Sequence, residues 1–175
     1  MEINLENFAS AKYDVFSMFN NQWALCTAGT PEEYNTMTIG WGTMGTIWGP
    51  ANHGKQIITV FLRESRKTSE ILLKNDNFTV CFFPEENRQD LLVLGSKSGN
   101  DVPDKVNLTA LTPRAAGDGV GFEQASLIFV CKKLHTHLMG KDELPDFLSE
   151  TLYKNGDFHY AFMGEIVDVF GTIDE

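Results

Sequence analysis

The sequence predicts a mainly β protein, a small antiparallel barrel with a few short helices. One reason is a series of apolar runs rich in β-branched and aromatic residues, each closed by turn-forming residues. Another is the content of 13 phenylalanines, which raises the aromatic share to 11% and suits a packed β core. With 175 residues and no repeat or internal linker, we expect one domain over residues 1–175.

Strands are expected wherever such an apolar run occurs. Residues 56–62 and 78–83 carry the strongest β signal, because β-branched and aromatic side chains dominate both runs. In the last run, Gly164 and Gly171 indicate bulges or close approaches of the backbone. The expected strands comprise residues 22–28, 36–41, 56–62, 78–83, 125–138 and 159–173.

The expected helices are short and lie between these runs. Thr68 is a suitable N-cap for a helix with Glu70 in its first turn and Lys74 in its last, as the helix dipole favours. Asn87 is expected to cap another. The expected helices comprise residues 8–19, 69–74, 87–95 and 142–154. Residues 105–124 give no clear pattern.

The charge is strongly negative overall but has one basic island. The net charge of −10 and the pI near 4.8 argue against binding to nucleic acid or to an anionic membrane, because phosphate surfaces would be repelled. The first fifty residues contain one basic residue, Lys12. A short segment then holds four cations against the single acid Glu64: Lys55, Arg63, Arg66 and Lys67. We interpret this island as a local anion site.

The three cysteines, Cys26, Cys81 and Cys131, each lie in an apolar run, and their odd number favours buried, reduced thiols. The N-terminal residues lack the basic and apolar regions of a signal peptide, and no apolar run approaches the length of a membrane span. We therefore expect a cytoplasmic protein without a membrane partner.

Residues 35–49 form an uncharged stretch with Trp41, Trp48, four glycines and several threonines. Such a mixture suits the wall of a site for a flat ring with polar edges. Residues 40–45 also spell G-x-G-x-x-G, and Glu64 follows where a ribose-binding acid would stand. A dinucleotide fingerprint must open a helix, however, and here β-forming residues and the Gly49-Pro50 break follow. We therefore reject the dinucleotide site and retain the ring wall.

Residues 63–68 are the main candidate for the anion site. Arg63, Arg66 and Lys67 alternate with hydroxyls just before a predicted helix, where free amides and the positive end of the helix dipole favour an anion. The alternative is a solvated surface turn whose cations balance nearby acids. Residues 95–99 are a second candidate nest, for which a flexible loop is the alternative.

His135 and His137 share one face of an expected strand with Cys131, which makes a metal site conceivable. No second group of ligands supports it, so no metal is expected. A histidine that contacts the edge of a ligand is the better interpretation. The sequence contains no recognisable catalytic triad and no paired carboxylates in a chemical context, so no catalytic residue is assigned.

Several motifs, taken in order, resemble those of a known family. They are Asn35-Thr36-Met37-Thr38 with Trp41, then Arg63-x-x-Arg66-x-Thr68, then Asn77-Phe78-Thr79-Val80, then Ser98-Gly99-x-Asp101-x-x-Asp104-Lys105. Their order and spacing resemble the flavin reductase-like family of FMN-binding split barrels, the flavoredoxin-type proteins. The likeness covers residues 23–171. This chain has Glu64 and Lys67 in a segment where family members often have Pro and Tyr.

The resemblance implies an antiparallel split β-barrel that forms a homodimer with FMN near the interface. It implies an oxidoreductase that passes electrons through bound flavin from NADH, NADPH or a protein donor. It also implies that Arg63, Arg66 and Thr68 surround the phosphate. The other implied flavin contacts are Asn35, Thr36, Met37, Thr38, Trp41, Ser96, Lys97, Ser98, Lys105, His137 and Phe170.

Two other functions are compatible with the same sequence. One is a flavin-binding carrier or sensor without reductase activity of its own. The other is a barrel of the same fold that binds haem or another ligand. The absorption spectrum of the purified protein separates these possibilities from the flavin-dependent enzyme, because bound oxidised flavin is yellow.

Overall fold

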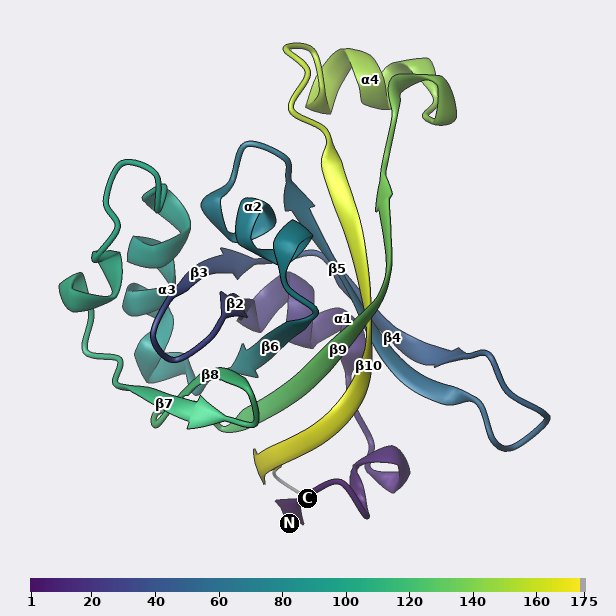
Figure 1. The fold of residues 1–175 in the computed structure, drawn as a ribbon, viewed down its shortest axis with the longest axis vertical. Helices are drawn as coiled ribbons and strands as arrows, with labels where there is room; N and C mark the ends of the chain where they lie inside the picture. Colours follow the sequence, from purple (N-terminus) through teal and green to yellow (C-terminus); the bar gives the residue numbers. More distant parts are fainter. Residues whose placement is uncertain (174–175) are drawn as a thin grey trace.

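The structure is a computed structural model, and it describes residues 1–173. The chain folds around one antiparallel sheet, with four short α-helices at its edges and ends (Figure 1). The strands are β1 (Glu2–Ile3), β2 (Ala24–Gly29), β3 (Tyr34–Ile39), β4 (Gly42–Ile47), β5 (Lys55–Arg63), β6 (Asn77–Phe82), β7 (Pro113–Ala116), β8 (Gly119–Phe122), β9 (Leu127–Leu138) and β10 (His159–Thr172). The helices are α1 (Val15–Ser17), α2 (Lys67–Lys74), α3 (Arg88–Ser96) and α4 (Asp146–Leu152).

The main sheet has the strand order β3-β2-β6-β9-β10-β5-β4, and β1 adds to β10 outside this path. All of its pairings are antiparallel, so the predicted mainly β, antiparallel fold class is confirmed. Strands β7 and β8 form a separate hairpin. Strands β3 and β4 stand at the two ends of the order although they are consecutive in the chain, and this separation is the split in the barrel.

Two pairs of strands extend beyond the barrel and give the molecule its outline (Figure 1). The ends of β9 and β10 form one extension, which carries α4 at its tip and which we call the arm. The β4–β5 hairpin forms the other extension. Helix α3 lies beside the edge strand β3. Helix α2 lies at the split, near β3 and β5. Strand β1 pairs with the end of β10 at the opposite end of the molecule from α4.

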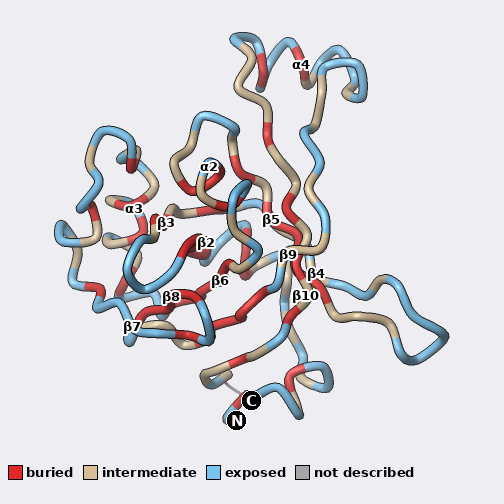
Figure 2. Tube along the Cα trace, viewed as in Figure 1, coloured by how far each residue is buried: buried red, intermediate tan, exposed pale blue. Residues whose placement is uncertain are grey.

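The buried side chains form two clusters on the two faces of the sheet, which Figure 2 shows as red segments at its centre. Phe78, Phe129 and Phe162 anchor the larger cluster, and Leu25 with Phe122 anchors the smaller one under α3 and the β7–β8 hairpin. Because both faces are covered, all six residues of β2 are buried. Its sequence therefore lacks the polar alternation of a half-exposed strand.

The first predicted helix is wrong. Residues 8–19 contain a short 3-10 turn, an extended segment and the three-residue α1, followed by a π-helical turn over Met18–Gln22. Phe8 and Tyr13 both pack edge-on against Phe129, and the Tyr13 hydroxyl donates to the carbonyl of Phe8. This packing overrides a weak local helix preference. Phe16, which lies within this segment, is 89% exposed.

Two other predicted helices begin at different residues in the structure. The second helix begins at Lys67 with Arg66 as its N-cap residue, so Thr68 lies inside the first turn. The last helix begins at Asp146, because Pro145 stands at the N-cap in an extended conformation. Residues 105–124, which gave no pattern, contain the β7–β8 hairpin. The rejected dinucleotide motif at residues 40–45 lies largely in β4, which confirms that it opens no helix.

The glycines of β10 occupy the positions that the sequence indicated. The β9–β10 register shifts between Met163 and Gly164, and a Cβ atom at Gly164 would lie 2.5 Å from a ring carbon of Phe78 and 2.9 Å from the Cβ atom of Cys131. Gly171 has φ +136° and a similarly close approach to the carbonyl of Ser126. The bulge therefore depends on the missing side chain.

We predict that Gly164→Ala destabilises the protein by about 1–3 kcal/mol, because an added methyl group overpacks a site with no room to relax. Gly45→Ala is the matched control, since a Cβ atom at Gly45 in β4 has no neighbour within 4 Å. Urea denaturation of the three proteins measures the difference. Equal stability of the Gly164 variant and the wild type would contradict the proposed close packing.

Candidate functional site

A cluster of polar and basic residues lies where the edge strand β3, the start of α2 and the loop after α3 meet. We call this set, comprising Asn35, Arg66, Thr68, Ser98 and Lys105, the cationic corner. The Thr68 hydroxyl donates to the Asn35 side-chain oxygen over 3.0 Å, which ties α2 to β3. The loop closes on the same point, because Gly99 packs against the Asn35 side chain where any larger residue would collide with it. Asn100 links the loop to the carbonyl of Ser65, just before α2.

Lys105 is the most unusual residue of the corner, since its side chain is buried, with 2% of the residue exposed. Its Nζ atom donates to the carbonyls of Leu94 and Lys97 over 2.8 and 2.9 Å. Within residues 1–173 no carboxylate forms an ion pair with it. Burial, with a smaller contribution from Arg66, lowers the pKa of Lys105 from 10.5 to about 8. A buried cation of this kind is stabilised by a nearby anion.

Arg66 adds a second cation to the corner, whereas Arg63 is already paired. The Arg63 guanidinium donates to the carbonyl of Asp157 over 2.8 Å and lies 3.9 Å from the Asp157 carboxylate. The Arg66 side chain makes no hydrogen bond or ion pair in the part of the chain that the structure describes. Its charge lowers the pKa of both Lys105 and His159, so it acts on both sides of the split.

The two residues that differ from the family pattern point elsewhere. The Glu64 carboxylate accepts a hydrogen bond from the backbone N–H of Phe158 over 3.0 Å, which fastens the end of β5 to the segment before β10. Lys67 pairs with Glu70 on the surface of α2 over 3.1 Å. Neither residue neutralises or crowds the Arg66 guanidinium.

Strand β3 leads from the corner along the split. Thr36 is fully buried and bonds to Thr27, the Thr38 hydroxyl donates to the carbonyl of Leu91, and Met37 packs against the larger core cluster. The side chains of β3 are thus occupied, but as an edge strand it offers free backbone N–H and C=O groups. A cavity of about 270 Å³ lies beside it, lined by Trp23, Thr38, Gly40, Leu91, Leu92, Gly95 and Ser96.

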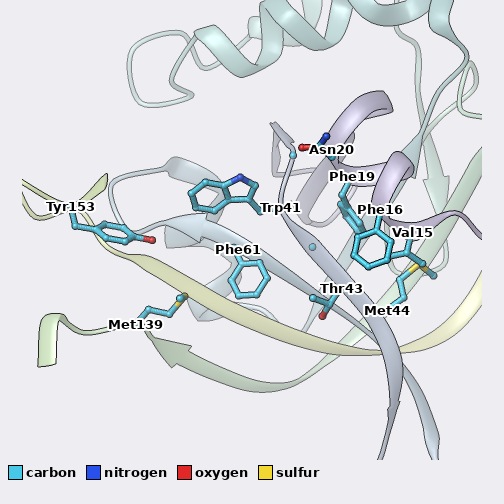
Figure 3. A pocket seen from close by; sticks show the side chains of 12 residues that line it. Val15, Phe16, Phe19, Asn20, Trp41, Thr43, Met44, Phe61, Met139 and Tyr153 are labelled. Atoms are coloured by element: carbon cyan, nitrogen blue, oxygen red, sulfur yellow. The ribbon is translucent and has the colours of Figure 1, made fainter. Parts of the chain in front are cut away.

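A larger cavity of about 680 Å³ lies beyond Gly40, which lines both cavities (Figure 3). Its wall is mainly aromatic and aliphatic, with contributions from β4, β5, the N-terminal turns and the arm. It is lined by Val15, Phe16, Phe19, Asn20, Gly40, Trp41, Gly42, Thr43, Met44, Phe61, Met139 and Tyr153.

One end of the large cavity is built by a group of aromatic rings in contact with one another. Trp41 lies against His159 with the ring centroids 4.7 Å apart, and the Tyr153 hydroxyl is 2.7 Å from Nδ1 of His159. Burial, together with the positive charge of Arg63, lowers the pKa of His159 to about 4. His159 is therefore neutral near pH 7. The Arg63 guanidinium lies over the Tyr153 ring, 5.6 Å from its centroid.

The structure brings together some of the predicted flavin contacts and separates others. Asn35, Arg66, Thr68, Ser98 and Lys105 meet at the corner, and the two that line the small cavity are Thr38 and Ser96. Trp41 lies at the large cavity. Lys97 contributes its carbonyl to Lys105, while its side chain is exposed.

The two late contacts, His137 and Phe170, lie far from each other. His137 is on the arm, where Nε2 is 2.8 Å from a carboxylate oxygen of Glu143. Phe170 packs against the smaller core cluster and lies under Arg114. His137 pairs with Ala161 of β10, so roughly 30 Å of strand separates it from Phe170. Both residues stay predictions.

Sequence reasoning missed the residues around His159. Tyr153, Phe61 and Met139 come from different elements that meet only in the folded chain. The sequence offered one signal, the predicted start of the last strand at residue 159. Strand pairing places this residue opposite Arg63. The packing of Trp41 on that histidine has no local signature.

Within residues 1–173 no group of three or more His, Cys, Asp or Glu residues is arranged to hold a metal ion. Cys131 is fully buried, whereas His135 and His137 are exposed. All three cysteines are buried and unpaired, and burial raises the pKa of each thiol. None of the helices of the described chain is both long and apolar enough to cross a membrane.

The sequence matches the family model described as flavin reductase like domain over residues 16–174. The chain therefore belongs to the flavin reductase-like family, which confirms the resemblance inferred from its motifs. No curated protein matches the sequence.

Solved structures of split-barrel proteins resemble the fold. A flavoredoxin from Methanosarcina acetivorans is 22% identical, with TM-score 0.62 over 86% of this chain and 68% of that chain. An FMN-binding protein from Thermus thermophilus, solved with bound 1-cyclohex-2-enone, is also 22% identical, with TM-score 0.65 over 92% and 78%. The flavoredoxin of Desulfovibrio vulgaris is 19% identical, with TM-score 0.63 over 87% and 69%. These similarities establish the split-barrel fold.

We predict that Lys105 makes the stability of the ligand-free protein depend on pH. Its folded pKa of about 8 lies below the usual 10.5, so the folded state binds fewer protons between these values, and the free energy of unfolding rises with pH across this window. Relative to Lys105→Met, the wild type should gain on the order of 1–3 kcal/mol between pH 8 and pH 10.5. Urea denaturation at several pH values measures this. Parallel curves for the two proteins would contradict the buried, unpaired cation.

Proposed function

We propose that the protein binds FMN and acts as an oxidoreductase of the flavin reductase or flavoredoxin type, with NADH, NADPH or a protein as electron donor. The observation that carries this proposal is the cationic corner. In a chain with a net charge of −10, Arg66 and the buried Lys105 have no carboxylate partner among residues 1–173 and lie beside the first turn of a helix. This donor set suits a phosphate group, and membership of the flavin reductase-like family supports FMN as the molecule that carries it.

The residues present fit the two ends of FMN in different ways. Arg66, Lys105 and the first amides of α2 would hold the phosphate, and Asn35 and Thr68 would fix the helix against β3. The free edge of β3 and the small cavity near Thr38 and Gly40 would take the polar edge of the ring. When bound, FMN supplies a ring that accepts and releases hydride or electrons. The chain positions that ring and keeps one face accessible.

The same proposal includes the assembly and location of the protein. We propose that residues 1–175 act as one domain, that the protein is a homodimer with the flavin near the interface, and that it is cytoplasmic. Exposed aromatic side chains on the N-terminal turns and on the arm, Phe16 and Phe147, support a subunit contact. The buried, unpaired cysteines are compatible with a reducing compartment.

We predict that the purified protein, alone or after addition of FMN, is yellow and loses its visible absorption on reduction. Anaerobic mixing with NADH and with NADPH then tests the enzymatic activity, because a reductase should bleach the flavin with at least one of them. A flavin that neither nucleotide reduces would favour a protein donor or a carrier. A colourless protein that takes up no FMN would refute the proposal.

We further predict that Arg66→Ala weakens FMN binding much more than riboflavin binding, because only FMN carries the phosphate. One charge-assisted contact contributes roughly 1.5–3 kcal/mol, or about 10- to 150-fold in affinity. Lys67→Ala is the matched control, because its neighbouring charge is paired with Glu70. Fluorescence titration with both flavins provides the affinities. Equal losses for FMN and riboflavin would place the phosphate elsewhere.

A further inference from the structure

The segment that leads into the cationic corner is bonded to the turn that precedes β10. Both oxygens of the Asp157 carboxylate accept from Ser65, whose backbone N–H donates over 2.9 Å and whose hydroxyl donates over 2.8 Å. Asp157 has φ 59°, a left-handed conformation that aspartate, asparagine and glycine tolerate better than other residues do. The turn therefore directs one carboxylate at Ser65, a residue 92 positions earlier in the chain.

The two residues before Ser65 are fastened to the same turn. The Arg63 guanidinium donates to the carbonyl of Asp157 over 2.8 Å. The backbone N–H of Glu64 donates to the carbonyl of Phe158 over 2.9 Å, and the Glu64 carboxylate accepts from the Phe158 N–H over 3.0 Å. Three consecutive residues are thus held by two, so the end of β5 cannot shift without breaking several hydrogen bonds at once.

Ser65 also connects this turn to the other wall of the corner. Its carbonyl accepts from the side chain of Asn100 over 3.3 Å, and Asn100 belongs to the loop that carries Ser98 and leads to Lys105. Its hydroxyl, which the sequence suggested for the anion, is used by Asp157 instead. The N–H, hydroxyl and carbonyl groups of Ser65 therefore join the turn before β10, the start of α2 and the loop after α3.

Arg66 follows directly, and only its backbone is held by the described chain. Its N–H donates to the carbonyl of Arg63 over 3.1 Å, and its carbonyl accepts from the N–H of Glu70 over 3.2 Å. Its guanidinium has no ion-pair partner within residues 1–173. Because the backbone is fixed and the charged group is free, the contacts of Ser65 set the place from which the Arg66 side chain extends.

We propose that Asp157 is a positioning residue of the anion site, and that its two hydrogen bonds to Ser65 hold Arg66 in place for a phosphate. The inference rests on the proposed function in so far as the phosphate belongs to FMN. An acid close to an anion site has two opposed effects, because its charge repels the anion while its hydrogen bonds align the arginine. Here alignment outweighs repulsion, since Arg63 at 3.9 Å and the two Ser65 donors already balance the carboxylate charge.

The sign of the change in FMN affinity distinguishes the two effects. Asp157→Gly removes the carboxylate and suits the left-handed backbone, and we expect it to weaken FMN about 3- to 10-fold, because the Arg66 contact is misaligned rather than lost. Riboflavin, which has no phosphate, should bind with unchanged affinity. Glu70→Gln is the matched control, since it removes an acid from the surface of α2 without touching Ser65, and it should not weaken FMN. Stronger or equal FMN binding by the Asp157→Gly variant, or equal losses for both flavins, would overturn the proposal.

Asp157→Asn separates the hydrogen bonds from the charge. Its side chain can accept from the Ser65 N–H and donate to the Ser65 hydroxyl, so we expect FMN affinity within about threefold of the wild type. In the ligand-free proteins, the Ser65 amide should exchange with solvent faster in Asp157→Gly than in Asp157→Asn. The Glu64 amide, which is bonded to Phe158, is the internal control. An asparagine variant as weak as the glycine variant, or equal exchange at Ser65, would contradict the role of these hydrogen bonds.

A double-mutant cycle tests whether the effect passes through Arg66. Asp157→Gly should cause little further loss of FMN affinity in the Arg66→Ala background. Near-UV circular dichroism shows whether each variant keeps its packed aromatic groups. Independent, additive losses of affinity in a folded double variant would refute the positioning role.

Inorganic phosphate tests the anion site without flavin. Titration of the isotope-labelled full chain, followed by NMR, should shift the backbone amide signal of Arg66, and the shift should require a higher phosphate concentration in Asp157→Gly. A protein that binds phosphate with this dependence on Asp157 but takes up no FMN would refute the proposed function alone. A protein that binds FMN equally well with and without the Asp157 carboxylate would refute this inference alone.

Discussion

The arrangement of the site depends on the pairing of β10 with both β5 and β9. This pairing places His159 opposite Arg63 and aligns Ala161 with both Phe61 and His137. The same pairing continues into the arm, and it therefore determines where Tyr153 meets the start of β10. A slip of one residue would turn each of these side chains to the other face of the sheet. At Gly164 the register of β10 with β9 shifts while its register with β5 continues, and the missing side chain lets Phe78 pack against β10.

The sequence predicted most strands, because each run of β-branched and aromatic side chains indicates a strand by itself. It also indicated the segment that contains Arg66 as a candidate anion site, since cations and hydroxyls before a helix have a local physical meaning. It did not predict that Arg63 would be paired with Asp157, a residue 94 positions away, and left Arg63 and Arg66 equivalent. It missed the large cavity for the same reason. Trp41, Phe61, Met139 and Tyr153 come from four segments, and no periodicity relates them.

The helix predicted for residues 8–19 shows the opposite case, because there a local sequence pattern indicated the wrong structure. Its aromatic residues have helical spacing, but Phe8 and Tyr13 reach Phe129 from separate turns, and Phe16 faces outward. Burial of two aromatic rings is worth more than the weak helix preference of a twelve-residue segment. Phe16, which lies in the short α1, is exposed and lines the large cavity instead of packing into the core.

The division of charge across the split gives its two sides different chemical character. On the β3 side, Lys105 and Arg66 provide positive charge that no acid of the described chain pairs with. Glu64 and Lys67, the residues that depart from the family pattern, instead contact Phe158 and Glu70. On the β10 side, Asp157 pairs with Arg63, and His159 is neutral. Because the cationic side attracts an anion and the apolar side rejects one, a phosphate would bind on the β3 side of Gly40 without any movement of the backbone.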